Sequence, residues 1–238
     1  MFTGLVREVG RLRGVRRRAG LTRLDVHAPE LAPRLAAGDS VAVNGICLTV
    51  TRPGRTGFTV DAAAETRRVT TLPRWRPGDP LHLEPALRAG DPLDGHLVLG
   101  HVDGTGRLAA LRNAGGSLFL TFSLAPELAR YLLPKGSVAV DGVSLTVDRG
   151  PFRDRFTVNL VPHTLRWTSF DRIRVGKSVN LEMDVLVKAA RSGDGLRGAW
   201  AGVPAQPDAS RDASARAPSV RSLTEILDRG WRRGAKGR

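Results

Sequence analysis

The sequence predicts a mainly β protein made of two similar small antiparallel barrels in tandem. The first observation is an internal repeat, because Ser40–Val50 (SVAVNGICLTV) recurs almost unchanged as Ser137–Val147 (SVAVDGVSLTV). Three more stretches recur in the same order and at a similar spacing: Gly10–Leu12 with Gly106–Leu108, Phe58–Asp61 with Phe156–Asn159, and Pro77–Glu84 with Val175–Glu182. Within each copy, short runs of alternating apolar and polar residues are separated by turn signals. Together these observations indicate a duplicated unit of about 97 residues.

The repeated stretch predicts one β-hairpin in each copy. The turns are Asn44-Gly45 and Asp141-Gly142, and both pairs tolerate the positive φ angles of a type I′ turn. Further short strands of the first copy are expected at Arg23–Val26, Gly57–Asp61 and Leu81–Glu84. Each copy also carries a proline-initiated stretch that predicts a short helix, at Pro29–Ala36 and Pro126–Leu133.

The composition changes after the second copy. We expect a first domain at residues 1–93, a second at 94–188, and a flexible tail at 189–238 that is rich in Ala, Gly, Pro and Ser. Within that tail, Ser222–Glu225 (SLTE) is typical of a capping box, which predicts a short amphipathic helix at about 222–229.

Composition narrows the class of protein. A single cysteine cannot form an internal disulfide, and neither a secretory signal nor a membrane-length apolar run is recognisable, so we expect a cytoplasmic protein. The net charge of +14 raises the possibility of a polyanionic partner. Aromatic residues make up only 5% and do not alternate with the basic runs, so nucleic acid is not the expected ligand.

Alternation along the hairpins divides their side chains between two faces. Ile46, Leu48 and Val50 should fill the barrel, which leaves Cys47 and Thr49 on the outer face. The second copy has the same pattern, with Ser144 and Thr146 outside. These polar faces could meet a ligand. The alternative is that Cys47 serves as a small apolar residue in a packed interface.

Several other chemistries lack support. Gly104–Ala109 fits a loose dinucleotide-binding pattern, but no alternation of strands and helices surrounds it, and a glycine-rich turn between strands is the preferred interpretation. None of the five histidines pairs with another ligand at a metal-binding spacing, so no metal is expected.

Val158–Leu165 parallels Val60–Arg67, and Pro162 favours a strand edge or loop whose free backbone groups could bind a heterocycle. An ordinary transition from strand to loop is the alternative there.

The chain contains six motifs in the following order: MFTGLV, NGICLTV, GHVDG, KGSVAVDGVSLTV, NLVPHTL and LEMD. In this combination the chain resembles the riboflavin synthase α-chain family over about residues 1–188. The resemblance implies two six-stranded Greek-key barrels and a C-terminal helix. It also implies that each barrel binds one 6,7-dimethyl-8-(1-D-ribityl)lumazine. Two such molecules would give riboflavin and 5-amino-6-(D-ribitylamino)uracil by transfer of a four-carbon unit, without a cofactor.

The resemblance also implies a set of site residues, carried over where the motifs match. With the first barrel we expect the following substrate-binding residues: Gly4, Leu5, Val6, Cys47, Leu48, Thr49, Asp61, Ala62, Ala63, Ala64, Glu65 and Thr66. With the second barrel we expect Gly100, His101, Val102, Lys135, Ser144, Leu145, Thr146, Asn159, Leu160, Val161, Pro162, His163 and Thr164. The catalytic candidates are His101 as a general base and Cys47 or Ser144 as hydrogen-bond donors or nucleophiles. We expect positioning of the two lumazines to supply much of the rate.

The family further implies an active site between the first barrel of one subunit and the second barrel of another, in a homotrimer. After Lys188 the sequence AARSGDGLRGAW is poor material for the trimer-forming helix of the family. Lumazine synthase is a partner that the pathway alone suggests. The alternative functions are a non-catalytic lumazine- or flavin-binding paralog and a basic nucleic-acid-binding protein.

Overall fold

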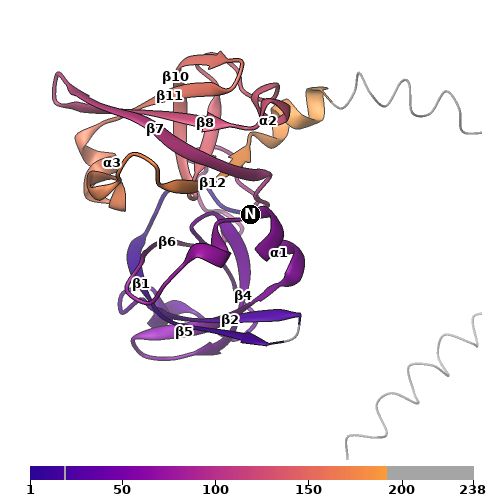
Figure 1. The fold of residues 1–238 in the computed structure, drawn as a ribbon. Coiled ribbons are helices and arrows are strands. Elements are labelled where there is room, and N and C mark those ends of the chain that lie inside the picture. Colours follow the sequence, from indigo (N-terminus) through magenta and orange to yellow (C-terminus); the bar gives the residue numbers. More distant parts are fainter. Residues whose placement is uncertain (19, 192–238) are drawn as a thin grey trace, which may run out of the picture. The chain divides into compact units, whose positions relative to one another are not determined.

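The computed structural model describes residues 1–18 and 20–191. Within this part, the chain forms two closed antiparallel barrels of six strands each. Figure 1 shows the two groups of strands that form them. The tail helix expected at about 222–229 lies outside the described residues. The domain boundaries 1–93 and 94–188 stay predictions.

The first barrel has the strand order β1-β2-β5-β4-β3-β6. Its strands and short helices are β1 (Glu8–Arg18), β2 (Leu21–His27), η1 (Ala32–Arg34), β3 (Ser40–Val43), β4 (Ile46–Pro53), β5 (Gly57–Ala63), α1 (Ala64–Val69), η2 (Leu72–Arg74) and β6 (Pro80–Pro85). Strands β3, β4 and β5 follow one another as hairpins, and β5 then pairs with β2, which is the Greek-key arrangement.

The second barrel repeats this order strand for strand, as β7-β8-β11-β10-β9-β12 closed on itself. Its elements are β7 (Gly104–Ala114), β8 (Ser117–Leu124), α2 (Pro126–Ala129), β9 (Ser137–Val140), β10 (Val143–Phe152), β11 (Arg155–Leu160), α3 (Pro162–Arg166), η3 (Ser169–Arg172) and β12 (Ser178–Met183). Residues 185–191 form a further helical segment after β12. The duplicated sequence therefore gives a duplicated fold.

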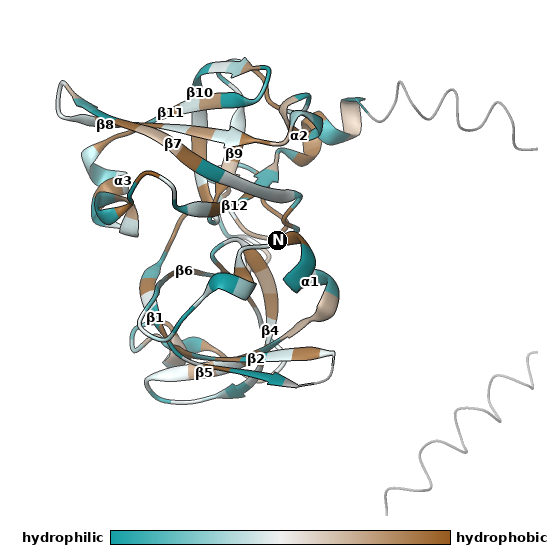
Figure 2. Cartoon of the chain, in the orientation of Figure 1, coloured by the Kyte–Doolittle hydropathy of each residue, from teal (hydrophilic) through white to brown (hydrophobic). Residues whose placement is uncertain are grey.

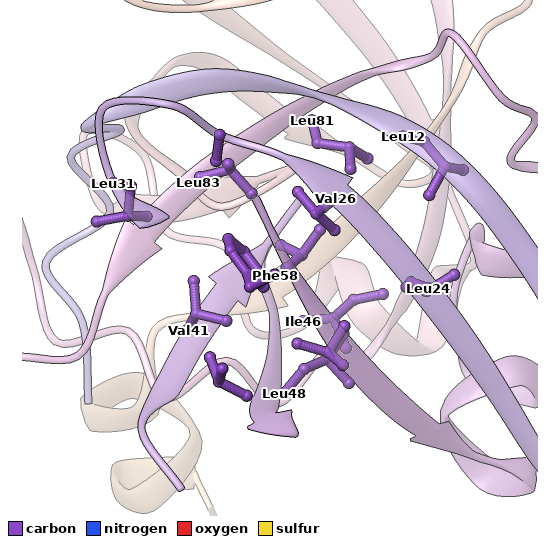
Figure 3. Packing of buried hydrophobic residues seen from close by; sticks show 14 of the residues in the cluster. Leu12, Leu24, Val26, Leu31, Val41, Ile46, Leu48, Phe58, Leu81 and Leu83 are labelled. Atoms are coloured by element: carbon purple, nitrogen blue, oxygen red, sulfur yellow. The ribbon is translucent and has the colours of Figure 1, made fainter. Parts of the chain in front are cut away.

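Each barrel has its own apolar core. Figure 3 shows the first, with side chains such as Leu24, Val41 and Phe58 pointing inward from different strands. The second is packed around Phe122 and Phe156, whose ring centroids lie 5.6 Å apart. Figure 2 shows apolar and polar residues alternating along the strands, as expected where one face is buried and the other is not. Burial of these alternating side chains is the main stabilising contribution to each barrel.

The expected hairpins form with the expected turns. Asn44 and Gly45 have φ angles of 46° and 77°, and Asp141 and Gly142 have 43° and 78°. Both turn residues are thus left-handed in each copy, as a type I′ turn requires. The strands predicted at Arg23–Val26, Gly57–Asp61 and Leu81–Glu84 lie within β2, β5 and β6.

Two local predictions were wrong, and a third is confirmed as a helix but not in its length. The helix expected at Pro29–Ala36 is only the 3₁₀ turn η1, because Pro33 falls inside it and cannot donate a backbone hydrogen bond. The helix expected at Pro126–Leu133 is limited to the four residues of α2. The glycine-rich stretch from Gly104 is not a turn but the start of β7, and glycine is favoured at position 106 because a Cβ there would lie 2.9 Å from the Ser123 carbonyl oxygen.

The two barrels contact each other through a nearly symmetric set of hydrogen bonds at the hairpin turns. In the first barrel the His82 N–H donates to Asn44 Oδ1, and in the second the Asn180 N–H donates to Asp141 Oδ1, both at 2.7 Å. Across the interface, His82 Nδ1 lies 3.0 Å from the Asp141 carbonyl oxygen, and Asn180 Nδ2 lies 2.8 Å from that of Asn44. Burial lowers the pKa of His82 to about 4, so its ring is neutral at physiological pH.

The turns approach so closely that glycine is required at their tips. A Cβ on Gly45 would lie 2.7 Å from the Gly142 nitrogen, and a Cβ on Gly142 would lie 2.7 Å from the Gly45 nitrogen. The turn glycines therefore serve twice, once for their positive φ angles and once for this contact.

Candidate functional site

The outer faces of the two repeated hairpins form the centre of the candidate site. Ile46, Leu48 and Val50 are buried in the first core, while Cys47 is half-buried and Thr49 is exposed. In the second barrel, Leu145 is likewise buried while Ser144 is half-buried and Thr146 exposed. The division into two faces predicted from alternation is confirmed.

Two short segments, one before each barrel, lie against these outer faces. We name residues 2–6 the N-terminal arm and residues 98–102 the linker arm. The arms pair with each other through Phe2 and Val98, whose backbone hydrogen bonds measure 2.7 and 3.1 Å. Cys47 packs beside this pair, in a small apolar cluster with Ala42 and Ala139. The thiol thus also has the interface packing that the alternative interpretation expected.

Each arm contacts the repeated hairpin of the barrel that it does not precede. The Ser144 N–H donates to the Gly4 carbonyl oxygen at 2.8 Å, and the Cys47 N–H donates to that of Gly100 at 2.9 Å. Further along the arms, Val6 packs against the core of the second barrel and Val102 against the core of the first.

This exchange corrects the predicted grouping of site residues. Gly4, Leu5 and Val6 were expected with the first barrel, but their arm lies against the second. Gly100, His101 and Val102 were expected with the second barrel, but their arm lies against the first. The repeat reveals which residues are equivalent, but it contains no information about which barrel an arm contacts. The outcome places His101, which is exposed, directly after the contact between Gly100 and Cys47.

At Gly4 and Gly100, the contacts between the arms and the hairpins leave no room for a side chain. Gly4 and Gly100 have φ angles of +76° and +78°. A Cβ on Gly4 would lie 2.6 Å from Ser144 Cβ, and a Cβ on Gly100 would lie 2.4 Å from Cys47 Cβ. Both the backbone conformation and the available space therefore require glycine at these positions.

The remaining predicted segments extend from the last strand residues into short helices. In the first barrel, Asp61, Ala62 and Ala63 end β5, and Ala64, Glu65 and Thr66 begin α1. In the second, Asn159 and Leu160 end β11, Val161 precedes α3, and Pro162, His163 and Thr164 begin it. The strand edge or loop expected at Val161-Pro162 is confirmed at Val161, which lies between β11 and α3. It is wrong at Pro162, because proline fits the first turn of a helix, where its missing N–H costs nothing.

Asp61 is, with Glu65, one of the two charged residues of the first-barrel segment. It pairs with Thr49 in the register of β4 and β5, and its carboxylate accepts two hydrogen bonds from Arg23 at 2.7 and 2.8 Å. The hydrogen bonds from Arg23 lower the pKa of Asp61, so the group is ionised at neutral pH.

Lys135 is an unusual residue at the second barrel. Its φ angle is +63°, and its N–H donates to the Val147 carbonyl oxygen at 3.0 Å. In the first copy Gly38 has the equivalent bond, to Val50, with a φ angle of +95°. A left-handed lysine is uncommon, and such residues are concentrated at functional sites. Its ammonium group contacts Asp148 at 2.9 Å.

The sequence reasoning missed His96. Its Nδ1 lies 2.7 Å from the Ser144 hydroxyl oxygen, and its N–H donates to the Thr3 carbonyl oxygen at 3.1 Å. Burial lowers the pKa of His96, although the charge of Asp184 opposes this effect, so the ring is neutral at pH 7. The only sequence signal was a histidine close before the linker arm, and spacing alone could not connect it to a serine 48 residues away.

Two further observations bear on ligands. A groove of about 1000 Å³ lies between the start of β1 and the region around η3, with basic residues such as Arg166 and Arg174 along it, and it includes none of the predicted site residues. Among the described residues, no group of three or more His, Cys, Asp or Glu side chains could hold a metal ion. In the same part of the chain, no helix is long and apolar enough to cross a bilayer.

Comparison with known proteins now identifies the family. The model of the lumazine binding domain matches the chain twice, at residues 3–86 and 99–184. The riboflavin synthase of Bacillus subtilis is 37% identical over 188 residues, which span 79% of this chain and 87% of the relative. The chain belongs to the riboflavin synthase family. The riboflavin synthase of Mycobacterium tuberculosis is 41% identical over 191 residues, 79% of this chain and 95% of the relative.

Solved structures agree with this family at the level of the fold. The chain superimposes on LumP in complex with riboflavin with a TM-score of 0.71 and 21% identity, covering 77% of this chain and 99% of LumP. LumP in complex with 6,7-dimethyl-8-(1'-D-ribityl)lumazine gives a TM-score of 0.70 at 20% identity, with the same coverage. The paired lumazine-binding domains of the family thus correspond to the two barrels observed here.

Proposed function

We propose that this chain is a riboflavin synthase, and that each barrel contributes one half of the reaction. Two molecules of 6,7-dimethyl-8-(1-D-ribityl)lumazine would react, one giving up four carbons to become 5-amino-6-(D-ribitylamino)uracil and the other gaining them to become riboflavin. The atoms and electrons of the two substrates balance those of the two products, so no oxidant or reductant is needed. The relatives named riboflavin synthase favour this enzyme over a non-catalytic lumazine- or flavin-binding paralog.

The observation that carries the proposal is a pair of surfaces that match in geometry but differ in chemistry. We name as the first half-site the outer face around Cys47, the Asp61–Thr66 segment and the linker arm. The second half-site comprises the outer face around Ser144, Lys135, the Asn159–Thr164 segment and the N-terminal arm. Equivalent backbone geometry suits two identical ligands. The thiol on one side and the serine–histidine pair on the other suit different roles for them.

The acid–base chemistry can be assigned to named groups. The 7-methyl group of the lumazine is acidic because its anion delocalises into the ring, and a base of near-neutral pKa can remove its proton. His101 lies exposed on the linker arm at the first half-site and can accept that proton. At the second half-site, neutral His96 can accept the proton of Ser144 across their 2.7 Å contact, which would allow the hydroxyl to add to the ring or activate water.

Donor and acceptor must also be brought together. We propose that the first half-site of one subunit faces the second half-site of another, in a homotrimer. Holding the two ring systems in contact would then supply much of the rate, since proximity alone can contribute roughly 7–11 kcal/mol. On this account single substitutions at Cys47, His101 or Ser144 reduce turnover rather than abolish it.

The proposal is tested by incubating the purified full chain with the ribityllumazine and following riboflavin by absorbance. We expect riboflavin to accumulate without any added cofactor. Tight binding of the lumazine with no riboflavin would overturn the proposal and favour the non-catalytic paralog. Binding of nucleic acid but not of lumazine would overturn it in favour of the basic nucleic-acid-binding alternative.

A further inference from the structure

Two buried glutamates occupy equivalent positions in the last strand of each barrel. Glu84 in β6 is 5% exposed, and Glu182 in β12 is 3% exposed. A buried carboxylate is unfavourable unless hydrogen bonds replace its water, so the partners of these two groups deserve a physical account. Neither residue belongs to the half-sites defined above.

Both carboxylates bond to the backbone of the arms. Glu84 accepts hydrogen bonds from the Thr3 N–H at 2.6 Å, the Thr3 hydroxyl at 2.8 Å and the Gly4 N–H at 3.0 Å. Glu182 accepts bonds from the Leu99 N–H at 2.7 Å and the Gly100 N–H at 3.0 Å. Each carboxylate thus uses its two oxygens on two successive residues of one arm, which fixes both the position and the direction of that segment.

The bonds lead from each glutamate to the opposite barrel. Glu84 belongs to the first barrel, but the Gly4 that it holds accepts the backbone bond of Ser144 in the second. Glu182 belongs to the second barrel, but the Gly100 that it holds accepts the bond of Cys47 in the first. In both cases the next residues of the arm, Leu5 and His101, enter the half-site.

We infer that Glu84 and Glu182 are positioning residues, each of which orders the half-site of the barrel to which it does not belong. This inference rests on the proposed function, because it concerns the same two half-sites. Glu84 controls the second half-site through the N-terminal arm, and Glu182 controls the first through the linker arm. Because each glutamate acts on the opposite barrel, the effects of Glu84 and Glu182 on the two half-sites can be measured separately.

The glutamates can have this effect because the contacts between the arms and the hairpins allow little displacement of the arm backbone. A hydrogen bond to an ionised group is roughly twice as strong as one between neutral groups. Replacing glutamate by glutamine removes the charge and turns one oxygen into an NH₂ donor that faces a backbone N–H donor. Gly4 and Gly100 accept the backbone bonds of Ser144 and Cys47, and a Cβ built on either glycine would lie under 3.0 Å from that residue. A shift of the arm therefore moves Ser144 or Cys47 as well.

Glu8 provides a matched control. It is a buried glutamate of β1, 9% exposed, and its carboxylate accepts bonds from the backbone N–H groups of Glu30 at 3.4 Å and Leu31 at 2.7 Å. These partners lie in the first barrel itself and not in an arm. Glu8→Gln therefore reproduces the loss of a buried carboxylate charge without disturbing the arms.

The experiment measures the binding of ¹³C-labelled ribityllumazine to the full chain by NMR. The two bound signals are assigned with Cys47→Ala and Ser144→Ala. For Glu84→Gln we expect at least tenfold weaker binding at the half-site perturbed by Ser144→Ala, and a change of less than twofold at the other. For Glu182→Gln we expect the converse, and for Glu8→Gln less than twofold at both. Turnover should fall in the first two variants, because both half-sites must be filled.

A milder variant keeps the test decisive if Glu84→Gln does not fold. Thr3→Val removes the hydroxyl bond to Glu84, together with the bond that the Leu5 N–H donates to the same hydroxyl, and leaves both backbone bonds to Glu84 in place. We expect it to weaken the second half-site selectively by severalfold. Hydrogen exchange should accelerate at the amides of residues 2–6 in Glu84→Gln and of residues 98–102 in Glu182→Gln.

The inference is overturned if either glutamine variant weakens the half-site of its own barrel instead, or both half-sites equally. It is also overturned if Glu8→Gln matches their effect. The outcome is distinct from failure of the proposed function, because binding at each half-site is measured whether or not riboflavin forms.

Discussion

Replacing the buried Asp141 by asparagine should make the protein more stable at neutral and alkaline pH. Asp141 lies in the turn of the second hairpin and is 9% exposed. Burial raises the pKa of its carboxyl from 3.8 to about 7, against the opposing effects of the Asn180 N–H bond and the charge of Lys177. The same place in the first hairpin is occupied by Asn44, which accepts an equivalent backbone bond without a charge.

The sign and the size of this change in stability follow from the coupling between proton binding and folding. A carboxyl whose pKa is higher in the folded state binds more protons there, so the stability of the wild type falls as pH rises from about 4 to about 7. A change of pKa from 3.8 to about 7 corresponds to about 4 kcal/mol once the group is fully ionised. Asparagine keeps an oxygen for the Asn180 N–H. We therefore expect Asp141→Asn to gain about 2–4 kcal/mol over the wild type at pH 8, and close to nothing at pH 4.

The measurement is urea unfolding followed by tryptophan fluorescence at several pH values between 4 and 8. Other groups with shifted pKa values, such as His82, Glu84 and Glu182, are present in both proteins and largely cancel in the difference. Asn44→Asp is the matched reverse change, and it should introduce the same pH-dependent loss of stability into the first hairpin. The reasoning would be refuted if the free energies of unfolding of the wild type and Asp141→Asn differed by the same amount at every pH between 4 and 8.

Three further outcomes are expected. Gly100→Ala should destabilise the protein and weaken the first half-site more than Gly78→Ala does. Both glycines have positive φ angles, at which an alanine costs about 1–2 kcal/mol, but only Gly100 has no room for a Cβ. Equal free energies of unfolding for the two variants would contradict this. His96→Gln should lower kcat and alter the acid limb of the pH–rate profile, because burial lowers the pKa of His96 and His101 remains as the other proton acceptor. An unchanged profile would exclude His96 as the proton acceptor of Ser144. Mixing Cys47→Ala with Ser144→Ala chains should restore activity above that of either variant if the half-sites meet across subunits, whereas a simple average would argue for reaction within one chain.

The sequence was sufficient to predict the duplication and the hairpins. An almost unchanged stretch at both Ser40–Val50 and Ser137–Val147 requires equivalent backbone geometry, and a side-chain period of two separates Leu48 from Cys47 whatever surrounds them. Local errors arose where two signals competed. Pro33 limited a stretch that otherwise favours a helix, and Gly106 served close packing within a strand rather than a turn.

The exchange of arms could not be predicted in the same way. Whether Gly4 contacts its own barrel or the other one depends on how two folded units pack, and no local propensity encodes that choice. The same holds for His96, whose bond to Ser144 joins two residues that lie 48 positions apart in the sequence. A buried glutamate at the equivalent place in both copies, Glu84 and Glu182, was visible in the repeat, but its meaning depends on the arms that it holds.

The most direct test of the central claim is the stoichiometry of the reaction, measured by chromatography of all three compounds after the pure chain has acted on ribityllumazine alone. A dismutation between two non-equivalent half-sites predicts that riboflavin and 5-amino-6-(D-ribitylamino)uracil appear in equal amounts, and that two lumazines disappear for each riboflavin. Lumazine that is recovered unchanged, or riboflavin formed without an equal amount of the uracil, would contradict it.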